Sequence, residues 1–267
     1  MQPGCVRTRL LITVMTYPHP SQGYQELVCT AGVTEAGEWV RLYPVDYRYR
    51  PTTQRFRKYQ WVEVDLAPTG TRNDKRKESR RPDLDSIRIV GPPLPTANAW
   101  AARRAIVDRM AHRTLSQLKA LYDTESASLG IVRPSRVLDI EVTPVEPRWK
   151  PEWQRLFSQV RLFGEQQKPL RKLPYKFQYV FECEDSEQPH RAMIEDWELG
   201  VLFLKESERL GSDEAAADSV RKKFLEELCA PDRDTRFFMG TRFPYNTWLV
   251  VGVFWPPKRI STREALL

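Results

Sequence analysis

The sequence contains no long hydrophobic run, no closely spaced pair of cysteines and no glycine-rich nucleotide-binding loop. A membrane-spanning helix needs roughly 18 or more consecutive apolar residues. The longest apolar candidates, residues 10–15 and 248–255, have the length of strands. A basic stretch followed by an apolar stretch and a small-residue cleavage site is also missing, so export is not indicated. We therefore expect a cytoplasmic protein that does not contact membranes.

The cysteine pattern argues against both disulfides and a metal centre. The four cysteines lie far apart without repeated spacing, at Cys5, Cys29, Cys183 and Cys229. Reduced thiols fit this pattern better than a disulfide framework. Cys183 and His190 are seven residues apart, but structural zinc sites usually contain close-spaced ligand pairs. The sequence therefore predicts no metal and no cofactor.

Motifs of the common enzyme classes are missing too. We find no Walker-type loop, no G-x-G-x-x-G, no G-x-S-x-G and no Asp/Glu-x-Lys triplet. Two groups of carboxylates are alternatives for a metal-dependent nuclease site: Asp139 with Glu141, and Glu195 with Asp196 and Glu198. Acidic residues at the start of a helix are also explained by capping and the helix dipole. We lean towards a non-enzyme, with a nucleic-acid-processing enzyme as the alternative.

Positive charge is concentrated in the first two thirds of the chain. The net charge is +7; residues 1–175 hold 29 Lys and Arg against 18 Asp and Glu, whereas residues 176–267 hold 13 against 17. A basic region of this kind is typical of proteins that bind a phosphate-bearing partner. The acidic remainder is a candidate contact for a protein partner.

Hydrophobic periodicity predicts the α+β class. Short apolar or alternating segments predict strands at 9–17, 25–33, 39–43 and 61–66, which suggests a small, curved, barrel-like sheet at the N-terminus. Helical spacing begins at residue 96, and Ser212 followed by two acidic residues predicts a helix start. The apolar strand near 248–255 is expected to be central in its sheet. We divide the chain into a basic β-rich part (1–95), a helical connector with a strand (96–175) and an acidic α+β part (176–267).

The stretch EWVRLYPVDYRYRP (38–51) is the strongest candidate for a binding surface. If residues 39–43 form a strand, Trp39, Arg41 and Tyr43 point to one side, opposite Val40 and Leu42. An aromatic–guanidinium–aromatic face can stack on bases. Alternatively, another element covers the aromatic rings and the arginine extends to water. The flanking arginines of the expected platform are Arg48 and Arg50.

A basic segment follows the predicted strand 61–66. Six cations without an apolar anchor, which could neutralise phosphates, occur there: Arg72, Lys75, Arg76, Lys77, Arg80 and Arg81. A solvated loop is the alternative interpretation. Two further groups extend the basic character along the chain: Arg55, Arg57 and Lys58 before the strand, and Arg103, Arg104, Arg109 and Arg113 after the loop.

Several tracts together resemble a bacterial family of uncharacterised sequences: LLITVMTYP, VCTAGV, EWVRLYPV, KYQWVEVDL, MIEDWELG and NTWLVVGVFWPP. This resemblance spans most of the chain and implies no activity. The succession of EWVRLYPV and KYQWVEVDL is also similar in style to small RNA-binding barrels of the PUA and ASCH type, which is an analogy at the level of fold.

The expected function is non-catalytic binding of RNA or DNA, with RNA slightly favoured. Trp39, Arg41 and Tyr43 would form the stacking platform, and the segment 72–81 the electrostatic clamp. With a protein partner on the acidic part, the chain would be a subunit of a ribonucleoprotein or a defence complex. The alternatives are a metal-dependent enzyme and a protein-interaction subunit without nucleic-acid contact.

Overall fold

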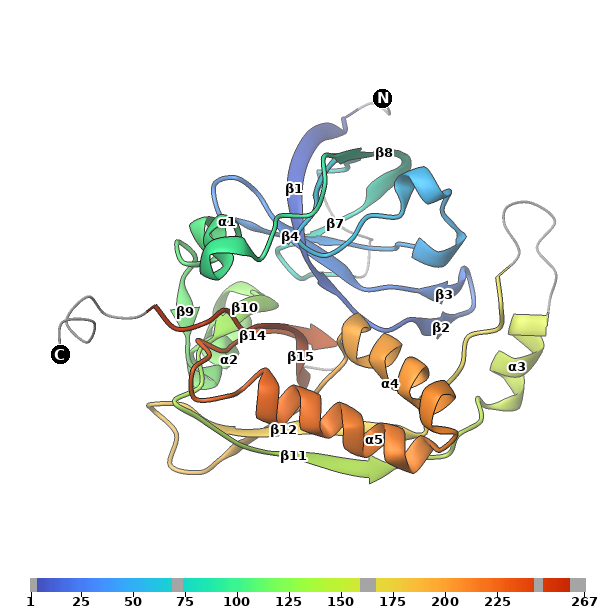
Figure 1. Cartoon of the computed structure of the whole chain (residues 1–267). Helices are drawn as coiled ribbons and strands as arrows, with labels where there is room; N and C mark the ends of the chain where they lie inside the picture. The colour runs from blue at the N-terminus through green and yellow to red at the C-terminus, as the bar shows by residue number, and fades with distance from the viewer. Residues whose placement is uncertain (1–3, 69–73, 159–166, 243–246, 260–267) are drawn as a thin grey trace.

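A six-stranded sheet is built from the apolar and β-branched segments of the first 90 residues (Figure 1). The structure is a computed structural model that describes residues 4–68, 74–158, 167–242 and 247–259. The strands of this sheet, in spatial order, are β7 (Ser79–Arg80), β5 (Trp39–Leu42), β4 (Thr30–Val33), β1 (Val6–Met15), β6 (Trp61–Leu66) and β8 (Pro82–Val90). A small hairpin, β2 (His19–Ser21) and β3 (Gln25–Leu27), follows β1.

The N-terminal sheet curls strongly, as the sequence predicts. Its two edge strands, β7 and β8, are separated in the chain by Arg81 alone, so the edges must approach each other. The sheet order contains no ladder between them, so the sheet is curved but is not a closed barrel. Its inner face encloses a cluster that includes Leu10, Ile12, Phe56 and Val62. Two short 3-10 helices, η1 (Tyr47–Tyr49) and η2 (Thr52–Gln54), precede β6.

A second sheet packs against the first through a shared apolar layer. Its order is β15 (Thr247–Phe254), β14 (Arg236–Arg242), β10 (Leu129–Val132) and β9 (His112–Arg113). Leu11 and Val14 of β1 meet Phe238, Leu249 and Val251 in one cluster of buried residues. This layer joins the N-terminal and C-terminal halves of the chain.

The prediction that β15 is central in its sheet is wrong, because β15 lies at the edge. It is apolar on both sides because both of its faces are covered: Leu249 and Val251 belong to the layer shared with β1, and Trp248 and Val250 to the C-terminal core. Its open edge is covered by the segment that precedes the helix starting at Trp197. In this segment the Glu195 N–H donates to the Val250 carbonyl at 2.9 Å.

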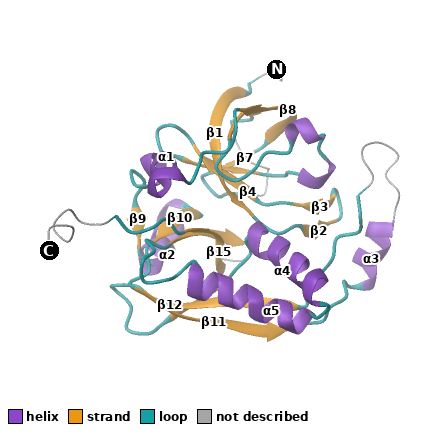
Figure 2. Ribbon diagram, in the orientation of Figure 1, coloured by secondary structure: helices purple, strands orange, loops and turns teal. Residues whose placement is uncertain are grey.

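The third sheet and the helices complete the α+β fold (Figure 2). The sheet order is β11 (Arg136–Pro144), β12 (Tyr175–Glu182) and β13 (His190–Met193). The helices are α1 (Ala97–Val107), α2 (Leu115–Glu125), α3 (Pro151–Ser158), α4 (Trp197–Leu210) and α5 (Asp213–Lys222), and a π-helical turn, η3 (Lys223–Glu227), continues α5. Ser212 caps α5 as predicted, since its side chain accepts from the Ala215 N–H.

Helix α4 sits close to the junction of the two halves. An ideal Cβ on Gly200 would lie 2.1 Å from the ring of Tyr17, so only glycine permits this approach of α4 to the end of β1. The isolated bridge between Thr16 and Asp196 fixes the same contact. The division at residues 95 and 175 stays a prediction, and the shared apolar layer shows that the parts pack on one another.

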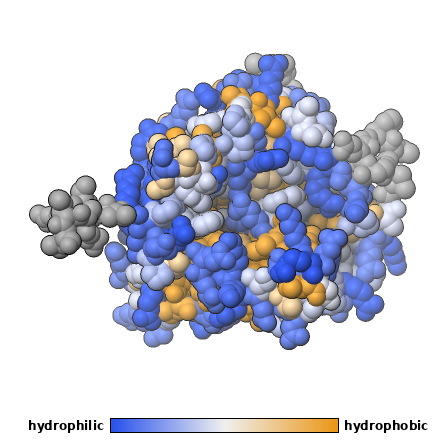
Figure 3. All heavy atoms as spheres, viewed as in Figure 1, coloured by the Kyte–Doolittle hydropathy of each residue, from blue (hydrophilic) through white to orange (hydrophobic). Residues whose placement is uncertain are grey.

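Of the helices that the structure describes, none has the length and apolar character needed to cross a membrane. On the face drawn in Figure 3, hydrophilic side chains predominate and hydrophobic ones form smaller patches.

Candidate functional site

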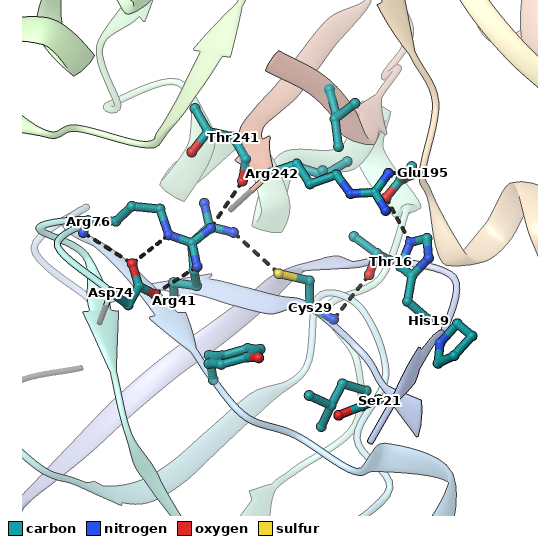
Figure 4. Close-up of a pocket in the computed structure, with 15 residues that line it drawn as sticks. Thr16, His19, Ser21, Cys29, Arg41, Asp74, Arg76, Glu195, Thr241 and Arg242 are labelled. Atoms are coloured by element: carbon teal, nitrogen blue, oxygen red, sulfur yellow. Dashed lines mark hydrogen bonds and ion pairs between the residues drawn. The ribbon is translucent and has the colours of Figure 1, made fainter. Parts of the chain in front are cut away.

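A cavity of about 440 Å³ lies where the end of β1, the β2–β3 hairpin and β5 meet β14 and β15 (Figure 4). Its volume falls within the ~300–1,000 Å³ typical of small-molecule sites, which are often found between domains. Both halves of the chain contribute to the wall, which consists of Thr16, His19, Pro20, Ser21, Leu27, Cys29, Arg41, Tyr43, Asp74, Arg76, Glu195, Thr241, Arg242, Leu249 and Val251. Apolar side chains, one aromatic ring and charges of both signs therefore face one space.

Arg41 is fixed in the wall by the residue that precedes β10. Its guanidinium donates to the carbonyl and the hydroxyl of Ser128 at 3.0 and 3.1 Å, and to Cys29 Sγ at 3.4 Å. The Glu78 carboxylate accepts from the N–H and the hydroxyl of the same serine. Burial lowers the pKa of Arg41, against the influence of Cys29 and Glu78. This arrangement holds a cation at a fixed position, 2% exposed.

Asp74 and Arg76 form the second charged group of the wall. The Arg76 Nε and a terminal nitrogen donate to the two Asp74 oxygens at 2.8 and 2.7 Å, and Ser79 Oγ donates to the same carboxylate. Burial alone would lower the pKa of Arg76, but the Asp74 hydrogen bonds raise it overall. Because Arg76 also donates to the Thr241 carbonyl at 3.1 Å, the pair ties the basic segment to β14.

The opposite side of the cavity contains a histidine–carboxylate–arginine row. His19 Nε2 and a Glu195 carboxylate oxygen are 2.8 Å apart, and an Arg242 nitrogen lies 3.7 Å from the other Glu195 oxygen. Burial raises the pKa of Glu195, but His19 and Arg242 outweigh it and the pKa is lowered. The side chain of Arg242 is 51% exposed, so the cavity reaches solvent on this side.

Two buried polar atoms in the wall lack a hydrogen-bond partner among the described residues. They are Arg41 Nε and Thr241 Oγ1. Buried polar groups without partners are rare in native structures and often mark sites where water or a ligand completes the network. Both belong to residues that line the cavity.

The expected stacking platform is not an open surface, which corrects our prediction. The ring of Trp39 packs edge-on against Phe238 of β14, and Arg41 is buried beneath the second sheet. The side chains of β5 alternate as predicted, but the second sheet covers the face that was expected to meet solvent. Trp39 and Tyr43 are both half-buried, but of these two rings only Tyr43 lines the cavity, beside Arg41.

The flanking arginines are also engaged within the protein. Arg48 pairs with the buried Glu26 at 2.9 Å, and Arg50 bridges Asp46 and Asp85 at 2.8 and 2.9 Å. Carboxylates of the same half therefore hold both arginines, and their role as flanks of a binding platform stays a prediction.

The predicted clamp is divided by the fold. Arg72 lies outside the described residues. Arg76 is buried, Arg80 is half-buried and donates to nearby carbonyls, and Lys77 pairs with Glu125 at the surface. Lys75 and Arg81 are exposed. Only part of the segment can therefore meet a phosphate directly.

Two further cations of the sequence-based basic patch are structural. Lys58 is buried between Asp196 and Glu198, with Nζ–oxygen distances of 2.5 and 3.1 Å. Arg104 is buried against Asp234 at 2.9 Å. Neither contributes to a basic surface.

The alternative catalytic carboxylates do not converge on one ion. Glu195 faces the cavity, whereas Asp196 caps α4 and binds Lys58. Asp139 and Glu141 pair with different arginines, Arg221 and Arg191, at 2.5 and 3.0 Å.

Two family models match different parts of the chain. Residues 111–267 match a family described as a domain of unknown function (DUF8757), and residues 6–109 match a second one (DUF8758). Because the first match covers more than half of the sequence, the chain belongs to the DUF8757 family. No curated protein matches the chain. The expectation of an uncharacterised family is confirmed, and the PUA and ASCH likeness stays an analogy.

Sequence reasoning missed most of the cavity. In the sequence, Cys29 is one of four widely spaced thiols and Glu195 belongs to a group of helix-start carboxylates, while His19, Thr241 and Arg242 belong to no motif. The clue in the sequence was the histidine of YPHPS, which lies between two prolines. In the structure its side chain contacts the Glu195 carboxylate.

Proposed function

We propose that the protein binds nucleic acid without catalysis, RNA slightly ahead of DNA, and holds one base of a single-stranded segment in the cavity between its two halves. The observation that carries the proposal is the composition of the cavity wall: a tyrosine ring, aliphatic side chains and fixed charges of both signs around about 440 Å³. Proteins that read single-stranded RNA splay bases out, stack them on aromatic rings and hydrogen-bond their edges.

Each part of such a base has a partner in the wall. Tyr43 offers a ring for stacking, worth roughly 1–3 kcal/mol per base. Arg242 offers donors, and the Glu195 and Asp74 carboxylates offer acceptors, to the edge of the base. Leu27, Leu249 and Val251 would exclude water from the remaining ring surface.

Exposed cations beside the cavity would contact the phosphates on either side of the bound base. Lys75 is exposed and lies between Asp74 and Arg76, which both line the cavity. Arg242 is half-exposed at the opposite wall. With only a few phosphate contacts, binding should weaken with salt less steeply than for proteins that cover long stretches of duplex.

The acidic C-terminal half favours a protein partner as part of the same proposal. Residues 176–267 carry four more acidic than basic side chains. Within a ribonucleoprotein or a defence complex, that surface would contact a neighbouring subunit while the cavity held the nucleic acid.

The test is the binding of fluorescent single- and double-stranded RNA and DNA across a salt series. Wild type is compared with Tyr43→Ala, Tyr43→Phe and Lys75→Ala, and with Lys222→Ala on α5 as the matched charge control. We expect single-strand preference, roughly five- to hundredfold weaker binding for Tyr43→Ala, near-normal binding for Tyr43→Phe, and a flatter salt slope for Lys75→Ala only.

Absence of binding at low salt would overturn the proposal. If Tyr43→Ala bound nucleic acid as tightly as wild type, the proposal that a base occupies the cavity would be wrong. Co-purification of a protein with no nucleic acid would favour the interaction-subunit alternative.

A further inference from the structure

A second group of side chains that can bind a ligand lies outside the cavity wall, at the turn that joins β12 to β13. Ligand atoms of Cys183, Asp185 and His190 all lie within 4.8 Å of one another. The sequence suggested only the first and last of these residues, and their spacing alone did not indicate a metal site. Folding of the hairpin places Asp185 beside them.

The three atoms are close to the arrangement that a zinc ion imposes. Bonds of about 2.0–2.3 Å in a tetrahedral site separate neighbouring ligand atoms by roughly 3.3–3.8 Å. Asp185 is exposed, so its carboxylate can make the small movement that closes the difference. Cys183 is 4% exposed and His190 is half-buried, so these two ligands are held by the core.

Each ligand is oriented by the surrounding structure. His190 is paired with Phe181 across the β12–β13 ladder, and the two rings lie 5.5 Å apart. Thr114, the N-cap of α2, donates its hydroxyl to Asp185 at 2.5 Å. Such contacts behind the ligands are typical of zinc sites, where they fix the geometry of each donor.

A bound cation would explain one feature of this group of residues. His190 Nε2 is buried and has no hydrogen-bond partner among the described residues, which is costly for an imidazole nitrogen.

We propose that Cys183, Asp185 and His190 bind one divalent zinc ion, which joins the two ends of the β12–β13 turn. The mixed thiolate, imidazole and carboxylate set is suited to zinc and not to magnesium or calcium, which prefer all-oxygen sites. Three protein ligands leave the fourth tetrahedral position to water. This site is independent of the nucleic-acid cavity, and its test does not require a nucleic acid.

The test uses the full chain without an affinity tag, titrated with Co²⁺ and then with Zn²⁺ in competition. Thiolate ligation of Co²⁺ produces a charge-transfer absorption that oxygen and nitrogen ligands do not produce. We expect one Co²⁺ per chain with this band, its displacement by Zn²⁺, and a higher Tm in the presence of Zn²⁺.

Variants at the three ligands locate the site. Cys183→Ser should abolish the charge-transfer band, and Asp185→Asn and His190→Gln should weaken binding at least about tenfold. Cys5→Ser is the matched control and should bind like wild type. Because Asp185 is exposed, its variant should fold even where Cys183→Ser does not.

The proposal is overturned if wild type shows no charge-transfer band, or if Asp185→Asn and His190→Gln bind Co²⁺ as tightly as Cys5→Ser. A band that Cys183→Ser retains would place the metal on another thiol and equally contradict the assignment.

Discussion

Glu195 and Asp196 are adjacent in sequence, yet their side chains enter two regions of opposite character. Glu195 faces the cavity, where its carboxylate lies 2.8 Å from His19 and 3.7 Å from the half-exposed Arg242. Asp196 enters a sealed joint, where it is 1% exposed and contacts the buried Lys58 at 2.5 Å. The same junction between β13 and α4 therefore serves a candidate binding site on one side and the packing of the two halves on the other.

The pKa values of the two carboxyls express this difference. In both cases burial raises the pKa, but at Glu195 the interactions with His19 and Arg242 outweigh it, so the pKa is lowered. At Asp196 burial prevails over the attraction of Lys58 and raises the pKa to about 6. A residue of the open region is thus expected to affect binding, and a residue of the sealed joint to affect stability.

The largest effect is expected for Lys58→Met in the sealed joint. Removal of one partner leaves the Asp196 charge buried and uncompensated, so the free energy of unfolding at pH 7 should fall by about 3–5 kcal/mol. Urea unfolding measures this, with Lys205→Met on α4 as the exposed control, expected within about 0.5 kcal/mol of wild type.

The double variant Lys58→Met/Asp196→Asn should recover much of that loss, because it removes the second charge as well. A loss below about 1 kcal/mol for Lys58→Met would contradict the description of this region as a sealed, charge-paired joint.

A second prediction concerns pH and Asp196→Asn. Because the folded-state pKa of Asp196 is about 6, above its ordinary value of 3.8, the folded protein binds a proton there before the unfolded chain does. Stability of wild type should therefore rise relative to Asp196→Asn by about 2–3 kcal/mol as the pH falls from 7 to 4. Urea midpoints at several pH values measure the difference, and an opposite slope would contradict the sign.

In the open region, Arg242→Ala should weaken nucleic-acid binding without loss of stability. Its side chain is half-exposed and loosely paired, so the free energy of unfolding should change by at most about 0.5 kcal/mol. Loss of its contact should weaken single-strand binding roughly five- to thirtyfold at low salt, about 1–2 kcal/mol. Arg209→Ala on α4 is the control. Equal losses of binding affinity for the two variants would show that Arg242 does not contact the nucleic acid.

The smallest effect is expected for Glu195→Gln. Because the folded-state pKa of Glu195 is lowered, its ionised carboxylate stabilises the fold at pH values above the ordinary pKa of 4.5. This stabilisation is lost as the pH falls through the folded-state pKa. We expect a loss below about 1 kcal/mol at pH 7 that closes on acidification, the reverse of the Asp196 slope. If the difference in the free energy of unfolding between wild type and Glu195→Gln widened at low pH, the contrast between Glu195 and Asp196 would be wrong.

Local features of the fold were predictable because their causes are local. Period-two alternation identified β6, and Ser212 followed by two acidic residues identified the start of α5. The position of β15 was not predictable in this way, because a strand covered on both faces reads the same at an edge as in the middle of a sheet.

The cavity was largely hidden because its contacts join distant positions in the chain. Arg41 meets a serine 87 residues away, Arg76 a carbonyl 165 away, and His19 a carboxylate 176 away. The sequence located a candidate binding region near Tyr43 but could not show that the second sheet covers Trp39 and Arg41. Composition and periodicity carry no information about which halves of a chain face each other.

The most direct test of the central claim is the rate at which iodoacetamide alkylates Cys29 with and without a saturating single-stranded RNA. Cys29 lines the cavity, while Cys5 lies in the wall of a different hollow and serves as the internal control. Occupation of the cavity by a base predicts strong protection of Cys29 and an unchanged rate at Cys5. Tight RNA binding with an unchanged rate at Cys29 would contradict the account.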